Sequence, residues 1–203
     1  GKVPAQYQLS RLELAKQTLK QGKFTQALKL VEECYIYPSN LGEGKLHGAQ
    51  ENDINYYKGC ILEALGRTQA AKEFFIAASN GGTQLVPAMY YNDQKPDKIF
   101  YQGLALRKLG YEEEACKRFS SLVAFGEKHL SDEFKMDYFA VSLPDLLIWE
   151  SDMNVKNKVH CNYLMGLGYL GLTESEKAKE YFNAAAEMDN NHQGVQIHNS
   201  MCS

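Results

Sequence analysis

Residues Gly59–Gly66 read GCILEALG, and residues Gly103–Gly110 read GLALRKLG. In both stretches a glycine is followed six positions later by leucine and seven positions later by a second glycine. Each stretch then continues with an alanine and an aromatic residue at matching places, which are Ala71 with Phe75 and Ala115 with Phe119. The two segments are therefore copies of one unit, offset by 44 residues.

Two further copies of this unit lie toward the ends of the chain. One is led by Gly166 and has matching residues at Tyr169, Leu172, Ala178, Phe182 and Ala185. A weaker copy near the start consists of Ala15, Gly22, Ala27, Val31 and Cys34. Four copies with small and large residues in matching positions indicate a true repeat, which is typical of stacked architectures.

Each copy predicts two amphipathic helices joined by a short turn. Apolar residues recur at helical spacing before Gly66 (Tyr57, Ile61, Leu65) and after it (Ala71, Phe75, Ala78). Gly66 and Gly110 are expected to end the first helix with a left-handed backbone conformation. Gly59, Gly103 and Gly166 are expected to let the paired helices approach closely, while Phe75, Phe119 and Phe182 fill the wedge toward the next unit.

Hairpins of this kind cannot bury their apolar faces alone and must stack. The expected fold is all-α, a right-handed α-α solenoid of four hairpins in a single domain over residues 1–203. Its units are expected at residues 8–37, 52–79, 96–125 and 158–189, with a partial capping helix at 190–203. Gly1 stands in place of an initiator methionine, which indicates a piece excised from a longer protein.

The pattern Gly-x-x-Leu/Tyr-x-x-Leu-Gly, followed by Ala, Phe and Ala, resembles the tetratricopeptide repeat, and the resemblance covers nearly the whole chain. The family repeats roughly every 34 residues, whereas the matching positions here lie 44, 44 and 63 residues apart. Thr173 also replaces the turn glycine in the last copy. The resemblance implies a concave groove, lined by the first helix of each unit, that holds a protein or peptide.

The extra residues form three insertions between units, at 38–50, 80–95 and 126–157. Their stretches 40–45, 88–93 and 137–145 resemble the C-terminal tetratricopeptide region of large bacterial proteins, where a β-rich region that acts on or binds carbohydrate precedes the array. That resemblance implies an accessory array in which any chemistry lies elsewhere in the parent protein. The insertions are either binding loops at one edge of the array or extra helical turns packed on the stack.

The groove prediction names six residues. Tyr56, Phe100 and Tyr163 each lie three positions before a helix-packing glycine and form an aromatic row, flanked by the polar residues Asp53, Asp97 and Arg107. Such a row suits a peptide or a sugar ring. The alternative is that these rings only pack against neighbouring helices. A clamp for the C-terminal carboxylate of a peptide is not expected. Arrays with such a clamp resemble one another in having Lys and Asn on this surface, and the corresponding residues here are Tyr56, Cys60, Phe100 and Leu104.

Composition and motifs exclude several other functions. With 22 basic against 25 acidic residues the chain has no nucleic-acid footprint, and no apolar run reaches the roughly 18 residues of a membrane span. The five cysteines lack a short C-x-x-C spacing and weakly favour a reducing, cytoplasmic compartment. No cofactor is expected, because the G-x-G-x-x-G match at Gly166–Gly171 lies in a helical pattern.

No metal or catalytic residues are expected either. His160 and Cys161 are adjacent and would point apart on a helix, and His192 and His198 lie in a tail that is expected to fray. The carboxylates Asp93, Asp97, Asp137 and Asp145 are interpreted as turn and helix-cap residues. The sequence therefore favours a non-catalytic scaffold for a protein or peptide, which in a multidomain parent would belong to the same polypeptide.

One alternative places function in the insertions. In this hypothesis the insertions complete an oligosaccharide site of a neighbouring domain. Exposed aromatic rings and a nearby carboxylate would form it, and the candidate residues are Tyr90, Tyr91, Asp93 and Trp149. A third hypothesis is self-association through the open end of the array.

Overall fold

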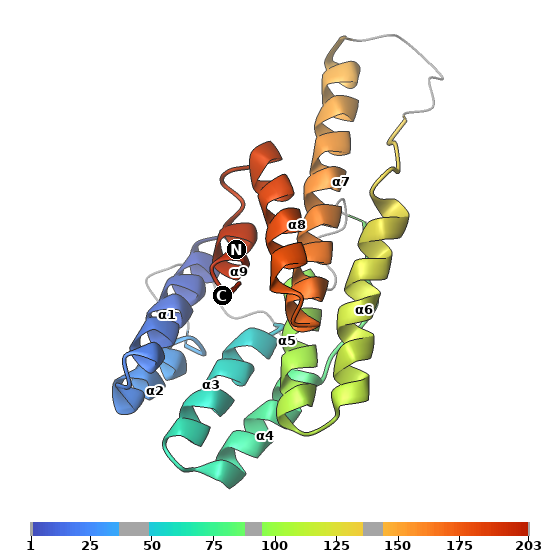
Figure 1. Cartoon of the computed structure of the whole chain (residues 1–203). Helices are drawn as coiled ribbons and strands as arrows, with labels where there is room; N and C mark the ends of the chain where they lie inside the picture. The colour runs from blue at the N-terminus through green and yellow to red at the C-terminus, as the bar shows by residue number, and fades with distance from the viewer. Residues whose placement is uncertain (1, 37–48, 88–94, 136–143, 203) are drawn as a thin grey trace. The chain divides into compact units, whose positions relative to one another are not determined.

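The computed structural model describes residues 2–36, 49–87, 95–135 and 144–202 (Figure 1). In these ranges all regular secondary structure is helical, which confirms the all-α prediction. The helices are α1 (Lys2–Lys20), α2 (Phe24–Glu33), α3 (Asn52–Ala64), α4 (Thr68–Ser79), α5 (Pro96–Lys108), α6 (Glu112–His129), α7 (Pro144–Gly171), α8 (Ser175–Met188) and α9 (Gln193–Asn199).

The helices belong to two compact units. The first unit contains Gly1–Gly81 and Leu104–Glu112, and the second contains Gly82–Gly103 and Glu113–Ser203. Helix α5 therefore contributes its first two turns to the second unit and its last turn to the first. The right-handed stacking of all four hairpins in one solenoid stays a prediction.

In the first unit the hairpins α1–α2 and α3–α4 enclose two apolar clusters. One is built on buried residues of α1, α2 and α3, which include Leu12, Val31 and Ile61. The other surrounds Phe75 of α4, with Leu62 of α3 and Ala105 at the end of α5. Apolar residues three and four positions apart on each helix form these faces, as the sequence pattern predicts.

The hairpin turns use the left-handed conformation that the sequence predicts. Gly66 has a φ angle of 74° and Gly110 of 87°, which confirms their expected role in ending α3 and α5. In the last hairpin this conformation falls on Thr173, whose φ angle is 63°. Left-handed φ angles are unfavourable for residues with a Cβ atom, and most of all for β-branched ones.

Each of the last three hairpins is closed by a phenylalanine ring lying on a glycine of the partner helix. A Cβ atom on Gly59 would come 2.6 Å from the Phe75 ring, and one on Gly166 would come 2.5 Å from the Phe182 ring. Gly103 lies against Phe119 in the same way. The expected close approach of the paired helices is therefore confirmed.

The described parts of the third insertion are mainly helical. Helix α6 continues to His129, and α7 begins at Pro144, so that α7 has 28 residues where α8 has 14. Between them, the backbone N–H of Phe134 donates a hydrogen bond to Oδ1 of Asn154, at 2.8 Å. These residues therefore favour the interpretation as extra helical turns over that as a binding loop.

Residues 82–87 of the second insertion form a segment of the second unit that is neither helix nor strand. The buried amide of Gln102 donates from Nε2 to the carbonyl of Gly82, at 3.0 Å. The buried imidazole of His160 donates from Nε2 to the carbonyl of Val86, at 3.1 Å. Side chains of α5 and α7 thus bind the backbone of residues 82–86 by its carbonyl groups.

Candidate protein-binding surfaces

The six predicted groove residues divide between the two units. Asp53, Tyr56 and Arg107 lie in the first unit, and Asp97, Phe100 and Tyr163 lie in the second. The row of three rings along one groove therefore stays a prediction.

In the first unit Tyr56 is half-buried on α3. Its ring meets Tyr57 edge-on with centroids 5.2 Å apart, and it packs against Phe75 at 6.0 Å. Burial raises the pKa of Tyr56 well above its usual value, so its hydroxyl stays neutral near pH 7. Asp53 lies one helical turn earlier and is also partly exposed. The two residues share one face of α3.

Arg107, at the end of α5, is partly exposed and engaged in a forked ion pair. Its Nε lies 2.9 and 3.0 Å from the two carboxylate oxygens of Glu112, and its Nη2 lies 2.7 Å from Oε1. A planar guanidinium presents this fork to a carboxylate with little loss of freedom. Arg107 therefore offers a carboxylate-binding group that an acidic residue of its own turn occupies.

In the second unit Phe100 and Tyr163 are buried. Phe100 packs against Phe119 with centroids 5.9 Å apart, and Tyr163 packs against Phe182 at 6.2 Å. This packing is the alternative that the sequence left open for these rings. Asp97 is partly exposed, and its Oδ2 lies 3.8 Å from Nζ of Lys98.

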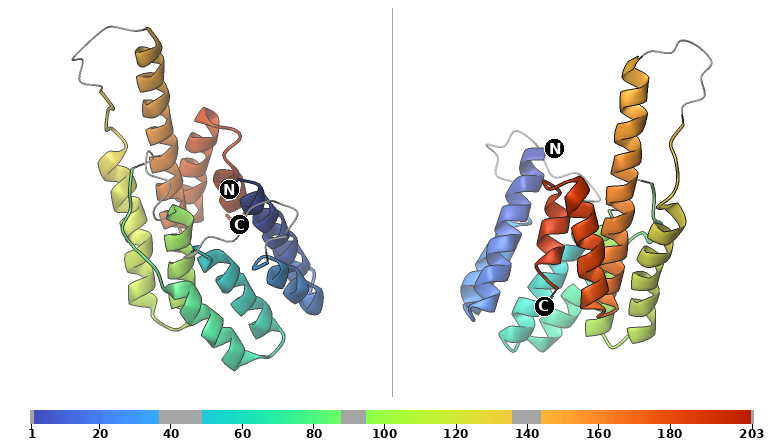
Figure 2. Two further views of the ribbon diagram at one scale, coloured as in Figure 1. Left: turned by 180° about the vertical axis from the view of Figure 1, so that it is seen from behind. Right: turned by 45° about the horizontal axis from the view of Figure 1, so that its top comes forward.

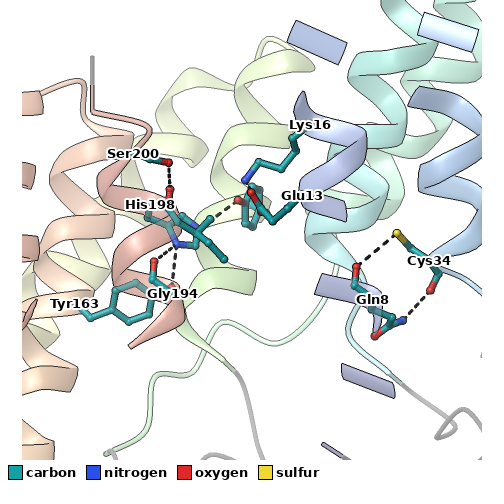
Figure 3. Close-up of polar contacts among 10 residues, drawn as sticks. Gln8, Glu13, Lys16, Cys34, Tyr163, Gly194, His198 and Ser200 are labelled. Carbon is teal, nitrogen blue, oxygen red and sulfur yellow. Dashed lines mark hydrogen bonds and ion pairs between the residues drawn. The ribbon is translucent and has the colours of Figure 1, made fainter. Parts of the chain in front are cut away.

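Phe100 and Tyr163 converge on a residue that sequence reasoning missed. The imidazole of His198, on α9, lies 5.6 Å from the Phe100 ring and 5.8 Å from the Tyr163 ring, and it is only 4% exposed. Figure 3 shows His198 beside Tyr163. The expectation that His198 lies in a frayed tail is therefore wrong. The sequence signal that could have revealed it is the spacing of Val195 and His198 on one face of a short helix.

The hydrogen bonds of His198 define its tautomer. Nδ1 lies 2.7 Å from the carbonyl oxygen of Gly194, which can only accept, so Nδ1 carries a proton. Nε2 lies 3.2 Å from the hydroxyl of Tyr101 and accepts from it when the imidazole is neutral. The Tyr163 hydroxyl lies 3.2 Å from Nδ1. Two tyrosines from α5 and α7 thus hold one side chain of a later segment by hydrogen bonds and ring contacts.

His192 begins α9 and lies beside the same cluster. Its Nδ1 accepts the backbone N–H of Val195, at 3.1 Å, which caps the helix. Its ring lies 4.8 Å from that of Tyr163, and burial lowers its pKa below the usual value. His192 is therefore placed as a neutral cap, which also contradicts the expected fraying of this tail.

His192 also lines a cavity of about 410 Å³. We call it the α7–α8 hollow, and its lining residues are Asp152, Val155, Lys156, Val159, Met188, Asp189 and His192. Val155 is 41% exposed and Met188 is 38% exposed. The hollow therefore combines accessible apolar side chains with a charged rim.

A second cavity, of about 330 Å³, lies between residues 87 and 157 of the second unit. It contains His129, whose Nδ1 lies 2.6 Å from Oδ2 of Asp132. Asn157 donates to the carbonyl of His129 at 2.8 Å, which ties α7 to the end of α6. These contacts stabilise the start of the α6–α7 connection.

The residues of the carbohydrate alternative fall outside the described part of the chain. This applies to Tyr90, Tyr91 and Asp93, and to the side chain of Trp149 within α7. Asp137 and the side chain of Asp145 lie outside it as well. A loop site for an oligosaccharide therefore stays a prediction.

The described ranges contain no cluster of three or more His, Cys, Asp or Glu side chains that could hold a metal ion. The five cysteines are free thiols. None of the described helices is both long and apolar enough to cross a bilayer.

This chain is similar to a solved structure and to a family of repeats. A solved structure described as "MamA RS-1 ArsTM double mutant" is 15% identical, with 97% of this chain and 92% of that chain covered, at a TM-score of 0.31. A TM-score this low does not indicate a shared fold or a shared partner. The tetratricopeptide repeat profile matches residues 53–79, which form α3–α4, and residues 159–192, which include the last part of α7 and all of α8. Each compact unit of this chain thus contains one segment similar to the tetratricopeptide repeat.

Proposed function

We propose that this chain is a non-catalytic scaffold that binds a peptide or protein segment. The binding faces belong to the first helix of each hairpin. Tetratricopeptide repeats generally mediate protein–protein interaction, and two segments match that family. The observation that carries the proposal is the seating of His198 between Tyr101 and Tyr163. Aromatic side chains of α5 and α7 there bind a side chain from another segment of polypeptide.

In the first unit the corresponding face is accessible. Asp53 and Tyr56 on α3 and Arg107 on α5 are all partly exposed. A half-buried tyrosine offers a partner an apolar ring and a neutral hydroxyl. Arg107 can exchange the carboxylate of Glu112 for one on a partner, because the pair is partly exposed and the guanidinium presents the same fork to either carboxylate. We therefore place peptide recognition at Asp53, Tyr56 and Arg107.

The proposal is tested with peptides selected from a random library displayed on phage, using the immobilised chain. Affinities of the selected peptides are then measured by fluorescence anisotropy. Tyr56→Ala is expected to weaken binding at least fivefold, and Tyr56→Phe less. Tyr111→Ala is the matched control, because Tyr111 is an exposed tyrosine of the same unit. Equal loss in both alanine variants, or no loss in Tyr56→Ala, would overturn the assignment.

The segment held in this way would belong to the same polypeptide in a multidomain parent, as the narrower resemblance implies. The bacterial, carbohydrate-associated parent is part of that proposal. The test uses fusions of the chain with candidate flanking regions. A flanking region that occupies the peptide surface of its own chain should weaken binding of the selected peptides. Undiminished peptide binding in every fusion would contradict an intramolecular partner.

A further inference from the structure

The α7–α8 hollow exists because α7 is twice as long as its partner. The hairpin turn lies at residues 172–174, and α8 runs back along α7 for 14 residues before it ends at Met188. Helix α7 continues well past that point toward its start at Pro144 (Figure 2). The side of α7 around Val155 therefore lies beyond the end of α8.

The floor of the hollow is apolar. Val159 is buried, whereas Val155 and Met188 are partly exposed, on α7 and α8 respectively. Exposed large apolar side chains in the described part of the chain are few and mostly scattered, but these two line the same cavity. Paired apolar residues in a rimmed cavity are typical of a surface that binds another chain.

The charges around the floor select the chemistry of the partner. Lys156 is already paired with Asp152, with Nζ 2.8 Å from Oδ2. Asp189 remains as an acidic group, whose Oδ1 accepts the backbone N–H of Asn191 at 3.0 Å. Helix α8 also ends here, and the carbonyl groups at a helix C-terminus attract cations. The lining is therefore apolar with net negative charge.

We propose that the α7–α8 hollow binds a basic amphipathic segment of a partner protein. Apolar side chains of that segment contact Val155, Val159 and Met188, and a Lys or Arg beside them pairs with Asp189. This surface lies in the second unit, whereas the peptide surface at Tyr56 lies in the first. The proposal is therefore independent of the proposed function.

The test uses two synthetic peptides of the same amphipathic pattern, one built of leucine and lysine and the other of leucine and glutamate. The reporter is the methyl NMR signal of Met188, and buried Met165 is the internal reference. The lysine peptide is expected to shift the Met188 signal saturably and to bind at least tenfold more tightly than the glutamate peptide. The Met165 signal should stay in place.

Matched variants distinguish binding at the hollow from nonspecific attraction of the lysine peptide to the negative charge of the chain. Val155→Ser and Asp189→Asn are expected to weaken binding of the lysine peptide at least fivefold. Ile76→Ser and Glu73→Gln on α4 are the controls, because Ile76 is 46% exposed and neither residue lines the hollow. The proposal would be overturned if both peptides bound with equal affinity, or if the affinity fell equally in the hollow variants and the controls. A Met188 shift on concentrating the protein alone would assign the hollow to a second copy instead.

Discussion

The ring of Phe182 lies directly against the backbone of Gly166, where a Cβ atom would come within 2.5 Å of the ring atoms Cδ1 and Cε1. Phe182 is fully buried, so its ring has little space into which it could move. The same relationship joins Gly59 to Phe75 and Gly103 to Phe119. The repeat therefore has a glycine at this position because the opposing ring occupies the volume of a side chain.

Replacement of this glycine should destabilise the second unit. Gly166→Ala is expected to lower the free energy of unfolding by about 1–3 kcal/mol, because overpacking forces the ring or the helix to shift. Urea unfolding measures the change. In the double variant with Phe182→Leu the loss should be smaller than the sum of the two single losses. Strictly additive losses would show that the two residues do not compete for the same space.

Replacement of Thr173 should have the opposite effect. Thr173→Gly is expected to raise the free energy of unfolding by about 0.5–1 kcal/mol, because a left-handed conformation costs a residue with a Cβ atom roughly 1–2 kcal/mol and the entropy of glycine offsets part of the gain. Thermal unfolding measures the shift. Thr25→Gly is the control, because Thr25 lies in the right-handed first turn of α2 and this variant should gain no stability. A lower melting temperature for Thr173→Gly would contradict strain at this turn.

The buried imidazole of His160 should make stability depend on pH. Burial lowers the pKa of His160 from 6.5 to about 4, so the unfolded chain binds the proton more readily than the folded one. Stability is therefore full above pH 6.5 and is lost as the pH falls toward 4, by on the order of 3 kcal/mol. Urea unfolding at several pH values measures this loss.

The variant His160→Gln removes the titrating group and retains a donor for the Val86 carbonyl. Its stability should fall less than that of the wild type between pH 6.5 and 4, because only the groups common to both proteins, the carboxylates and the other histidines such as His192, then titrate. Parallel curves for the two proteins would exclude His160 as the source of the pH dependence.

Asn52 should stabilise the end of α4 in the first unit. Its Nδ2 donates to the carbonyls of Ala78 and Asn80, at 2.8 and 2.7 Å, and the side chain is buried. Asn52→Ala should lower the free energy of unfolding by about 1–3 kcal/mol, because it leaves these acceptors without their donor. Asn190→Ala, at an exposed position, should change it by less than about 0.5 kcal/mol. Similar losses in both variants would argue against the capping role.

The sequence predicted local structure well because helical periodicity and turn glycines are local signals. Gly66 and Gly110 end their helices as expected, and Gly59, Gly103 and Gly166 lie where paired helices approach closely. That a phenylalanine ring of the same hairpin lies on each of these glycines was not predicted. Contacts between distant segments were not predictable in this way. The bonds from Gln102 to Gly82 and from Tyr101 to His198 join residues 20 and 97 positions apart, and no pattern within one helix encodes them.

For the candidate surfaces, too, local features were predictable from the sequence and contacts between distant segments were not. The spacing from the packing glycines identified Phe100 and Tyr163, but it could not show that α9 covers them, because that depends on where a later helix packs. The α7–α8 hollow depends on the unequal lengths of two helices. Interpreting residues 126–157 as an insertion concealed the long first half of α7.

The segment of residues 82–86, which precedes α5, bears on how this protein can be divided. A boundary drawn from the repeat pattern alone would start a fragment at Pro96, the first residue of a hairpin. That cut would remove the carbonyls of Gly82 and Val86, which accept hydrogen bonds from the buried side chains of Gln102 and His160. Residues 82–86 are thus an integral part of the second unit, although the repeat pattern assigns them to an insertion between units.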